Sequence, residues 1–103
     1  MRHLNFPDNV FDGIWVHASF FHIPKKDALK TLLGFKRVLR PTGILYISIK
    51  LGNGEKFDRK RFFALYTEKE FKDLLQACGF KILKTRKSNE RGEKWLYVFA
   101  KPA

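Results

Sequence analysis

The stretch from Ala28 to Lys50, ALKTLLGFKRVLRPTGILYISIK, most constrains what this chain can fold into. Its first part repeats apolar residues at steps of four and three, which places on one side of a helix Ala28, Leu32, Phe35 and Leu39. Pro41 cannot continue a helix, so the helix is expected to end near Arg40 and a Pro-Gly turn to follow. The apolar run from Ile44 to Ile49 then predicts a strand that is covered on both faces, in a mainly parallel sheet.

The composition is that of one packed domain with a single cysteine. Of 103 residues, 45% are hydrophobic and 16% aromatic, which is enough for a single core and argues against disorder. The single Cys78 can form no internal disulfide and is interpreted as a small buried hydrophobe. No apolar run approaches the roughly 20 residues of a membrane span, and the N-terminal MRHLNFPDN lacks the apolar core of a signal peptide. We therefore expect a soluble, cytoplasmic protein.

The charge of the chain is unusual. Lys and Arg number 21 against 10 Asp and Glu, which gives a formal net charge of +11 and makes nucleic acid a possible partner. The basic residues are spread over three segments without a recognised nucleic-acid motif: Lys25 to Arg40, Lys56 to Arg61 and Lys81 to Arg91. A solvated basic surface is therefore favoured somewhat over RNA binding.

The end of the first strand is the main candidate for a ligand site. The residues from Phe11 to His17 are expected to form this strand, and ligands of open α/β sheets bind at the carboxyl ends of parallel strands. The residues expected to face a ligand there are His17, Ala18, Ser19, Phe20 and His22. The two histidines lie five positions apart across a strand exit, which is not a metal-ligand spacing, so no metal site is predicted. One of them could act as a general base.

The second half of the chain contains clear boundary signals. Lys50 to Arg61 is the longest irregular stretch and is interpreted as an ordinary loop rather than a phosphate cradle. Thr67 and Glu70 form a capping box that begins a helix, which Gly79 ends in a left-handed conformation. Phe80 to Arg86 and Trp95 to Lys101 then flank a turn-rich segment, which predicts an antiparallel hairpin.

Two phrases in this chain resemble a known enzyme family. The phrase KRVLRPTGILYIS and the upstream phrase FPDNVFDGIWVHASFFHIP are similar to those around the fifth and fourth strands of class I S-adenosylmethionine-dependent methyltransferases. Thr42 stands where the family usually has the first glycine of a Gly-Gly pair. The resemblance implies an α/β fold that is a truncated Rossmann-like sheet with two main helices. In the family's strand numbering, the strands would lie side by side in the order four, five, seven, six. The strand that comes last in the chain would run antiparallel, and the family's first three strands would be absent.

The same resemblance implies a cofactor and two sets of site residues. The cofactor would be S-adenosylmethionine, whose methyl-bearing edge in the family is lined by residues that match His17, Ala18 and Ser19, with Phe20 and His22 in the same exit. The segment that often folds over the acceptor in the family corresponds to the region of Arg59, Arg61, Phe62 and Tyr66, although core packing is the simpler interpretation of its phenylalanines. Methyl transfer depends mainly on alignment, so no fixed catalytic residue is predicted.

The parts of the family pattern that are missing leave three functional hypotheses open. The sequence contains neither the Gly-rich cofactor loop nor the acidic residue that binds the ribose hydroxyls. The first hypothesis is therefore a methyltransferase-family domain that is inactive alone. The alternatives are a non-catalytic binding or regulatory half-domain, which completes or competes with a methyltransferase, and a basic RNA-associated module. We also expect a homodimer or other self-association through the edge strand Phe11 to His17, because its apolar centre would otherwise stay unpaired.

Overall fold

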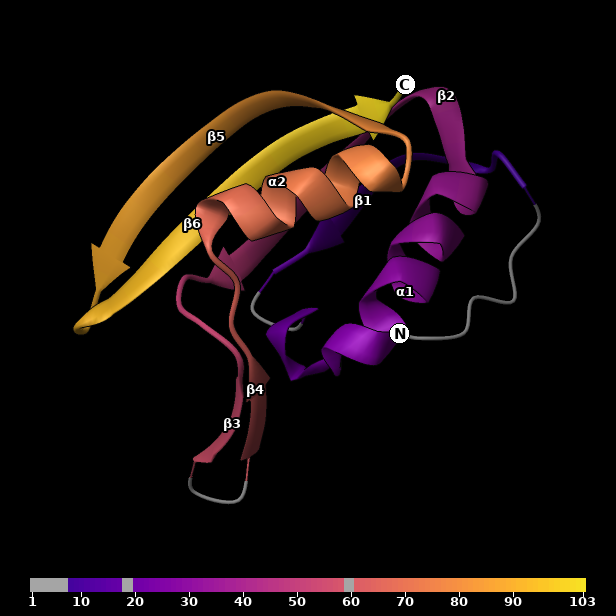
Figure 1. Ribbon diagram of the computed structural model, residues 1–103. Coiled ribbons are helices and arrows are strands. Elements are labelled where there is room, and N and C mark those ends of the chain that lie inside the picture. Colours follow the sequence, from indigo (N-terminus) through magenta and orange to yellow (C-terminus); the bar gives the residue numbers. More distant parts are fainter. Residues whose placement is uncertain (1–7, 18–19, 59–60) are drawn as a thin grey trace.

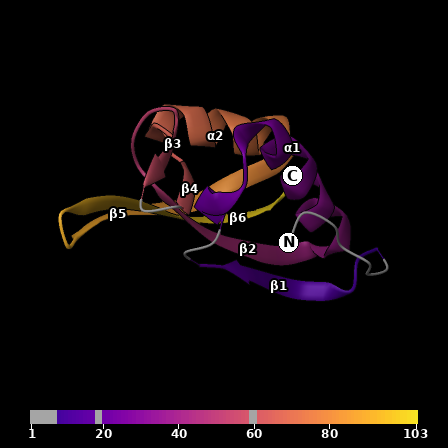
Figure 2. The same ribbon diagram turned by 90° about the horizontal axis from the view of Figure 1, so that it is seen from below.

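The computed structural model describes residues 8–17, 20–58 and 61–103, in which a layer of strands lies against helices. In chain order the elements are β1 (Phe11–Val16), the 3-10 helix η1 (Phe20–His22), α1 (Lys25–Val38), β2 (Leu39–Lys50), β3 (Glu55–Asp58), β4 (Arg61–Ala64), α2 (Glu68–Ala77), β5 (Phe80–Glu90) and β6 (Glu93–Pro102). Helices α1 and α2 lie on the same face of the larger sheet, and the β3–β4 hairpin projects away from that sheet (Figures 1 and 2). The other face of the sheet carries no helix of the described residues.

The larger sheet has four strands in the order β1-β2-β6-β5. Strand β1 pairs with β2 in parallel, whereas β6 runs antiparallel to both of its neighbours, β2 and β5. This confirms the expected order four, five, seven, six and the antiparallel last strand. The expectation of a mainly parallel sheet is wrong for these strands, since β1–β2 is the one parallel pair among them.

The junction between α1 and β2 differs from the predicted helix, turn and strand. Helix α1 ends at Val38 and β2 begins at Leu39, whose φ of −77° and ψ of 140° are already extended. The Pro-Gly turn is therefore not formed, and Pro41 lies within β2. The β1–β2 register explains how proline is tolerated: Phe11 is opposite Leu39 and Gly13 opposite Ile44, so the residues between Leu39 and Ile44 lie in an irregular part of the ladder.

The core lies between the helices and β2. The side chains of Leu45, Ile47 and Ile49 are fully buried on the helix-facing side of this strand, together with Leu32 of α1 and Phe71 of α2. Burying a side chain of this size contributes about 1.5 to 3 kcal/mol to folding. The strand is covered on both faces as expected, but the opposite face of β2 is covered by aromatic neighbours rather than by helices of the described residues, as the stacked rings of Trp15 and Tyr46 show.

Helix α2 has the boundaries that its sequence predicts. Thr67 Oγ1 accepts from the Glu70 backbone N–H at 3.1 Å, and the Thr67 backbone N–H donates to Glu70 Oε1 at 3.3 Å, which completes the capping box. Gly79 follows the helix with a φ of +84°, the left-handed conformation expected of it. Cys78 is buried, as predicted.

The last two strands form a longer hairpin than the sequence indicated. They meet at a two-residue turn, Arg91 and Gly92, with φ values of 53° and 77°. Positive φ at both positions matches the right-handed twist of the flanking strands. Pairing therefore continues to Glu90 opposite Glu93, beyond the predicted ends at Arg86 and Trp95.

The segment expected to be one long irregular loop contains a second hairpin. Strands β3 and β4 pair antiparallel, with Lys56 opposite Phe63 and Phe57 opposite Phe62. The chain then returns to the main sheet through a parallel bridge between Leu51 and Tyr66. This hairpin stands beside η1 and forms one wall of the site described next (Figure 1).

Candidate functional site

His17 comes directly after β1, at the carboxyl end of the parallel β1–β2 pair. Its Nδ1 lies 3.3 Å from Ser48 Oγ, and its ring is centred 6.5 Å from that of Trp95 and 6.3 Å from that of Tyr97. The imidazole is exposed, so it remains accessible to a ligand at this strand end.

Phe20 occupies a different place from the one expected of a ligand-facing residue. Its side chain is fully buried, with its ring 6.3 Å from that of Tyr66 and 5.8 Å from that of Phe71. An apolar side chain in a packed core gains more from burial than from a place at a pocket edge. Phe20 therefore anchors the strand exit to the core, while Ala18 and Ser19, named with it, lie outside the described residues.

His22 connects the exit of β1 to the β3–β4 hairpin. Its Nδ1 lies 2.9 Å from the carbonyl oxygen of Phe62, which is 40 positions away in the sequence. A carbonyl can only accept, so Nδ1 carries the hydrogen and the neutral ring has Nε2 as its proton-accepting nitrogen. The ring also lies 5.2 Å from that of Phe63. The structure thus brings together residues from the two segments that the sequence marked separately.

A groove of about 540 Å³ lies between these segments and is lined by His22, Pro24, Lys26, Glu55, Phe57 and Phe62. The rings of Phe57 and Phe62 meet edge to face at 5.4 Å, and the side chain of Phe57 is 76% exposed. An exposed phenylalanine beside a carboxylate and an ammonium group is typical of a binding surface rather than a core. We call this hollow the hairpin groove.

Among the residues that line this groove, the sequence marks His22 and Phe62 as site candidates but not Lys26, Glu55 and Phe57. The last two lie on β3, in the stretch interpreted as an ordinary loop. The alternation of Lys56 and Phe57 beside the pair Phe62 and Phe63 is a weak strand signal that could have indicated the hairpin.

The remaining acceptor-side candidates are divided between surface and core. Arg61 is exposed at the start of β4, whereas Tyr66 is only 2% exposed and is not among the residues that line the groove. The Tyr66 hydroxyl has no hydrogen-bond partner among the described residues. Burial, and then the carboxylates of Glu70 and Glu55, raise the pKa of this phenol above its ordinary value. Tyr66 therefore belongs to the core, where its ring lies 5.3 Å from that of Phe71. Arg59 lies outside the described residues.

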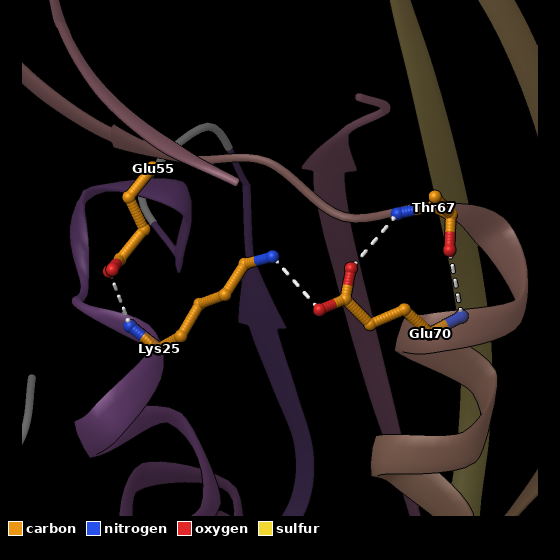
Figure 3. A network of polar contacts seen from close by, with 4 residues as sticks. All are labelled: Lys25, Glu55, Thr67 and Glu70. Atoms are coloured by element: carbon orange, nitrogen blue, oxygen red, sulfur yellow. Dashed lines mark hydrogen bonds and ion pairs between the residues drawn. The ribbon is translucent and has the colours of Figure 1, made fainter. Parts of the chain in front are cut away.

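A polar network holds the hairpin and both helices in place (Figure 3). The Lys25 backbone N–H donates to Glu55 Oε2 at 2.9 Å, which connects the N-terminus of α1 to β3. The Lys25 Nζ donates to Glu70 Oε2 at 2.9 Å and lies 4.7 Å from the centre of the Tyr66 ring. A carboxylate at a helix N-terminus is favourable in both charge and hydrogen bonding, so Glu55 is held at the edge of the groove.

Other reaction chemistries find little support in the parts of the chain that the structure describes. No group of three metal-binding side chains occurs there. Burial raises the pKa of the Cys78 thiol, which disfavours the nucleophilic thiolate. None of the described helices combines the length and apolar character needed to cross a membrane.

Comparison with known proteins gives matches to methyltransferases. A family model described as a methyltransferase domain matches residues 1–47. Phosphoethanolamine N-methyltransferase of Plasmodium falciparum is 30% identical over 84 residues, which are 74% of this chain and 32% of that protein.

Solved structures agree over almost the whole chain. The 1,6-didemethyltoxoflavin-N1-methyltransferase of Burkholderia thailandensis, crystallised with S-adenosylhomocysteine, matches with a TM-score of 0.86 and 21% identity, covering 99% of this chain and 48% of its own. An S-adenosylmethionine-dependent methyltransferase of Methanosarcina mazei matches with a TM-score of 0.82 and 21% identity, covering 98% of this chain and 63% of its own. The present chain therefore spans about a third to two thirds of the length of these relatives, and the two structures establish a shared fold.

Proposed function

We propose that this chain, which belongs to the class I S-adenosylmethionine-dependent methyltransferase family, supplies the acceptor side of a methyl-transfer site. The observation that carries the proposal is the hairpin groove, in which His22 from the exit of β1 and Phe62 from β4 are joined by a hydrogen bond of 2.9 Å. A groove between two segments that follow strand carboxyl ends is where an α/β sheet binds its ligands. Holding an acceptor there in one orientation is the main requirement of methyl transfer.

The cofactor edge of this site would be formed by the exit of β1. S-adenosylmethionine supplies an activated methyl group when bound. His17 fits a place beside it, since its ring is exposed at the strand end and is held by Ser48 and the neighbouring aromatic rings. The resemblance places Ala18 and Ser19 at the same edge, and both lie outside the described residues. The Phe20 side chain does not fit such a role because the core encloses it.

The groove favours a small acceptor that carries an amine and an anionic group. Glu55 offers a carboxylate to an ammonium group, and the faces of Phe57 and Phe62 attract a cation. Lys26 lines the same groove and can meet a phosphate or carboxylate. Phosphoethanolamine, the compound in the name of the Plasmodium relative, has both groups and is the first acceptor to test.

His22 has the right nitrogen for proton removal. An ammonium group must lose a proton before its nitrogen lone pair can attack a methyl carbon. The bond from His22 Nδ1–H to the Phe62 carbonyl directs Nε2 to accept that proton. His22 is therefore the proposed general base, and Phe62 positions it through its backbone.

We further propose that the 103 residues are inactive alone and that another polypeptide, with a second copy as the simplest case, pairs along β1 to complete the cofactor site. Among the described strands β1 pairs with β2 and with no other, so its second edge can accept a further strand. The side chain of Trp15 on this strand is 69% exposed. A catalytically silent half-domain that pairs with a methyltransferase in the same way is the alternative.

Acceptor binding can be tested without the cofactor. Phosphoethanolamine is titrated into the isotope-labelled chain, and backbone amide shifts are followed by NMR. We expect saturable shifts around His22, Glu55 and Phe62, about a tenfold weaker affinity for Glu55→Gln, and no change for Glu93→Gln at the far end of the β5–β6 hairpin. The amine-binding groove would be contradicted if phosphoethanolamine caused no amide shifts, or if Glu55→Gln and Glu93→Gln changed the affinity equally.

Cofactor binding is tested separately by calorimetry with S-adenosylmethionine, alongside native mass. We expect binding only in an associated form, weakened by His17→Ala and unchanged by His22→Ala. Where that form transfers methyl groups to phosphoethanolamine, His22→Ala is expected to lower the rate by about 10² to 10⁴. Binding by a monomer would refute completion by a second polypeptide, and loss of binding in the His22 variant would refute its role as a base.

A further inference from the structure

The β3–β4 hairpin lines a second hollow besides the hairpin groove. In this hairpin Lys56 is opposite Phe63 and Phe57 is opposite Phe62, so the two pairs lie on opposite faces. Phe57 and Phe62 line the hairpin groove, whereas Lys56 and Phe63 line the second hollow. Each face of the hairpin therefore forms part of a concave surface.

The second hollow has a volume of about 300 Å³ and lies between the β3–β4 hairpin and the turn of the β5–β6 hairpin. Both hairpins extend from the same end of the four-stranded sheet (Figure 1). The charged side chains that line the hollow are Lys50, Lys56, Glu93 and Lys94. We call it the lysine pocket. It has walls of this chain on both sides, so it is a hollow between elements rather than an uncovered sheet face.

Backbone hydrogen bonds hold the walls of the lysine pocket together. The Leu51 N–H donates to the Lys94 carbonyl oxygen at 2.9 Å, which connects the end of β2 to β6. The Tyr66 N–H donates to the Lys50 carbonyl oxygen at 3.3 Å, and the Gly52 N–H donates to the Tyr66 carbonyl oxygen at 2.9 Å. These two bonds connect the same segment to the residues after β4. The positions that carry the lysines are therefore set by the fold itself.

Lys50 is the most enclosed cation of the pocket, with a side chain that is 16% exposed. Its Nζ lies 2.9 Å from Glu93 Oε2, 4.4 Å from the centre of the Phe63 ring and 5.5 Å from the centre of the Trp95 ring. The Phe63 ring also lies 5.2 Å from that of His22 in the hairpin groove. Phe63 is therefore a wall that the lysine pocket and the groove share.

The lysine pocket has an excess of positive charge. Among the described residues that line it, Glu93 is the one acidic side chain, against three lysines. Lys56 and Lys94 are exposed, and neither forms an ion pair with another described residue. Like charges around one hollow repel each other, and apolar side chains such as Leu51 weaken the screening by water. An anion with two charges would balance the pocket.

We propose that the lysine pocket binds a dianionic phosphate group, as carried by a small phosphate monoester. Such a group has about −1.5 to −2 charges at neutral pH and three oxygens that accept hydrogen bonds. Lysine meets a phosphate as a point charge, whereas planar recognition of a carboxylate favours arginine. This site is separate from the hairpin groove and does not depend on the acceptor proposed there.

A nucleic-acid strand fits the lysine pocket less well. A phosphodiester carries a single negative charge, and bases need exposed rings on which to stack. Phe63 is only 9% exposed, and the Lys50 ammonium group lies over its ring. The volume of about 300 Å³ is also at the lower end of small-molecule sites. The pocket therefore favours one small phosphate group.

The test is titration of the isotope-labelled full chain with methyl phosphate, followed by NMR at constant ionic strength. Methyl phosphate is a dianionic monoester without an amine, so it lacks the group that the hairpin groove is proposed to recognise. We expect saturable shifts of the Leu51, Gly92 and Lys94 amides, which lie at the pocket. Dimethyl phosphate is the matched monoanion and should bind about tenfold more weakly.

Charge variants separate the pocket from general attraction to a basic protein. Lys56→Gln and Lys94→Gln should each weaken methyl phosphate binding about fivefold. Lys30→Gln removes the same charge from the exposed side of α1 and should leave binding unchanged. Glu93→Gln should strengthen binding, because it removes the carboxylate that opposes the ligand.

The proposal is overturned by any of three results. The pocket amides do not shift, methyl phosphate and dimethyl phosphate bind equally well, or Lys30→Gln weakens binding as much as Lys56→Gln. Occupation of the hairpin groove is followed at other amides, those of His22, Glu55 and Phe62. Failure of the lysine pocket is therefore distinguished from failure of the proposed acceptor site.

Discussion

Lys25 and Glu70, 45 positions apart, meet with Nζ 2.9 Å from Oε2 and so join the N-terminal ends of α1 and α2. The same glutamate completes the capping box of α2 through its other oxygen, and the lysine reaches Glu55 of the groove through its backbone. One carboxylate thus serves a local helix cap and a long-range contact. The groove wall, the α1 N-terminus and the α2 N-terminus are therefore mechanically connected.

The capping box and the Lys25 ion pair, which share Glu70, should be energetically coupled in a double-mutant cycle. Thr67→Ala removes the cap acceptor and is expected to lower the free energy of unfolding by about 1 kcal/mol. Lys25→Met keeps the aliphatic stem but removes the ion pair, and we expect a loss below about 1 kcal/mol because both side chains are partly exposed. Urea unfolding of both single variants and the double variant measures the coupling. Strict additivity would show that the cap and the ion pair do not share Glu70 energetically.

Tyr66→Phe should stabilise the protein. The Tyr66 hydroxyl is buried with no hydrogen-bond partner among the described residues, so it bears a desolvation cost without compensation. Its removal is expected to raise the free energy of unfolding by up to about 1 kcal/mol. Tyr97→Phe is the matched control, because Tyr97 is also a buried tyrosine but its hydroxyl is not left buried without a hydrogen-bond partner, so its loss should be neutral or destabilising. Equal effects in the two variants would show that the Tyr66 hydroxyl is satisfied in solution.

Much of the fold could be predicted where local chemistry determines the backbone. The capping box at Thr67 and the left-handed Gly79 mark both ends of α2, and the turn residues before Trp95 mark the last hairpin. The strand order followed from the resemblance carried by the phrases around β1 and β2. The caps and the turn depend on neighbouring residues alone, so the rest of the chain does not alter them.

The errors arise where tertiary packing decides. Pro41 was expected to terminate a helix, yet the backbone was already extended at Leu39 because that residue joins the core and pairs opposite Phe11. The β3–β4 hairpin has no strong turn signal and is held by contacts such as the Glu55 bond to Lys25. Phe20 was placed with the ligand-facing residues by its position in the chain, whereas its apolar ring is enclosed by the core.

Gly79→Ala should destabilise the protein mainly through backbone strain. Gly79 has a φ of +84°, and a left-handed conformation costs an L-residue about 1 to 2 kcal/mol. The added Cβ would also meet the Nζ end of the Lys36 side chain, which is flexible and can move. Gly92→Ala is the control, since Gly92 has a similar φ of +77° with no heavy atom close to an added Cβ. Similar losses in thermal or urea unfolding are expected, and a much larger loss at Gly79 would mean that Lys36 cannot yield.

Glu68 should make stability depend on pH at the acidic end. Its Oε2 lies 2.6 Å from Lys72 Nζ and its Oε1 lies 2.6 Å from Lys87 Nζ, so it connects α2 to β5. Hydrogen bonds from Lys72 and Lys87 lower the pKa of this carboxyl from 4.5 to about 2. Because the pKa is lower in the folded state, the contribution of Glu68 is fully present above pH 4.5 and is lost as the pH falls through about 2.

The measurement is the difference in free energy of unfolding between the unmodified chain and Glu68→Gln, taken from neutral pH down to about pH 2. A difference is needed because the net charge of +11 grows in acid and lowers the stability of both proteins. We expect the difference to be constant above pH 4.5, to shrink below it and to decrease with added salt, since these groups are near the surface. A difference that stays constant down to pH 2 would show that Glu68 makes no folded-state ion pair in solution.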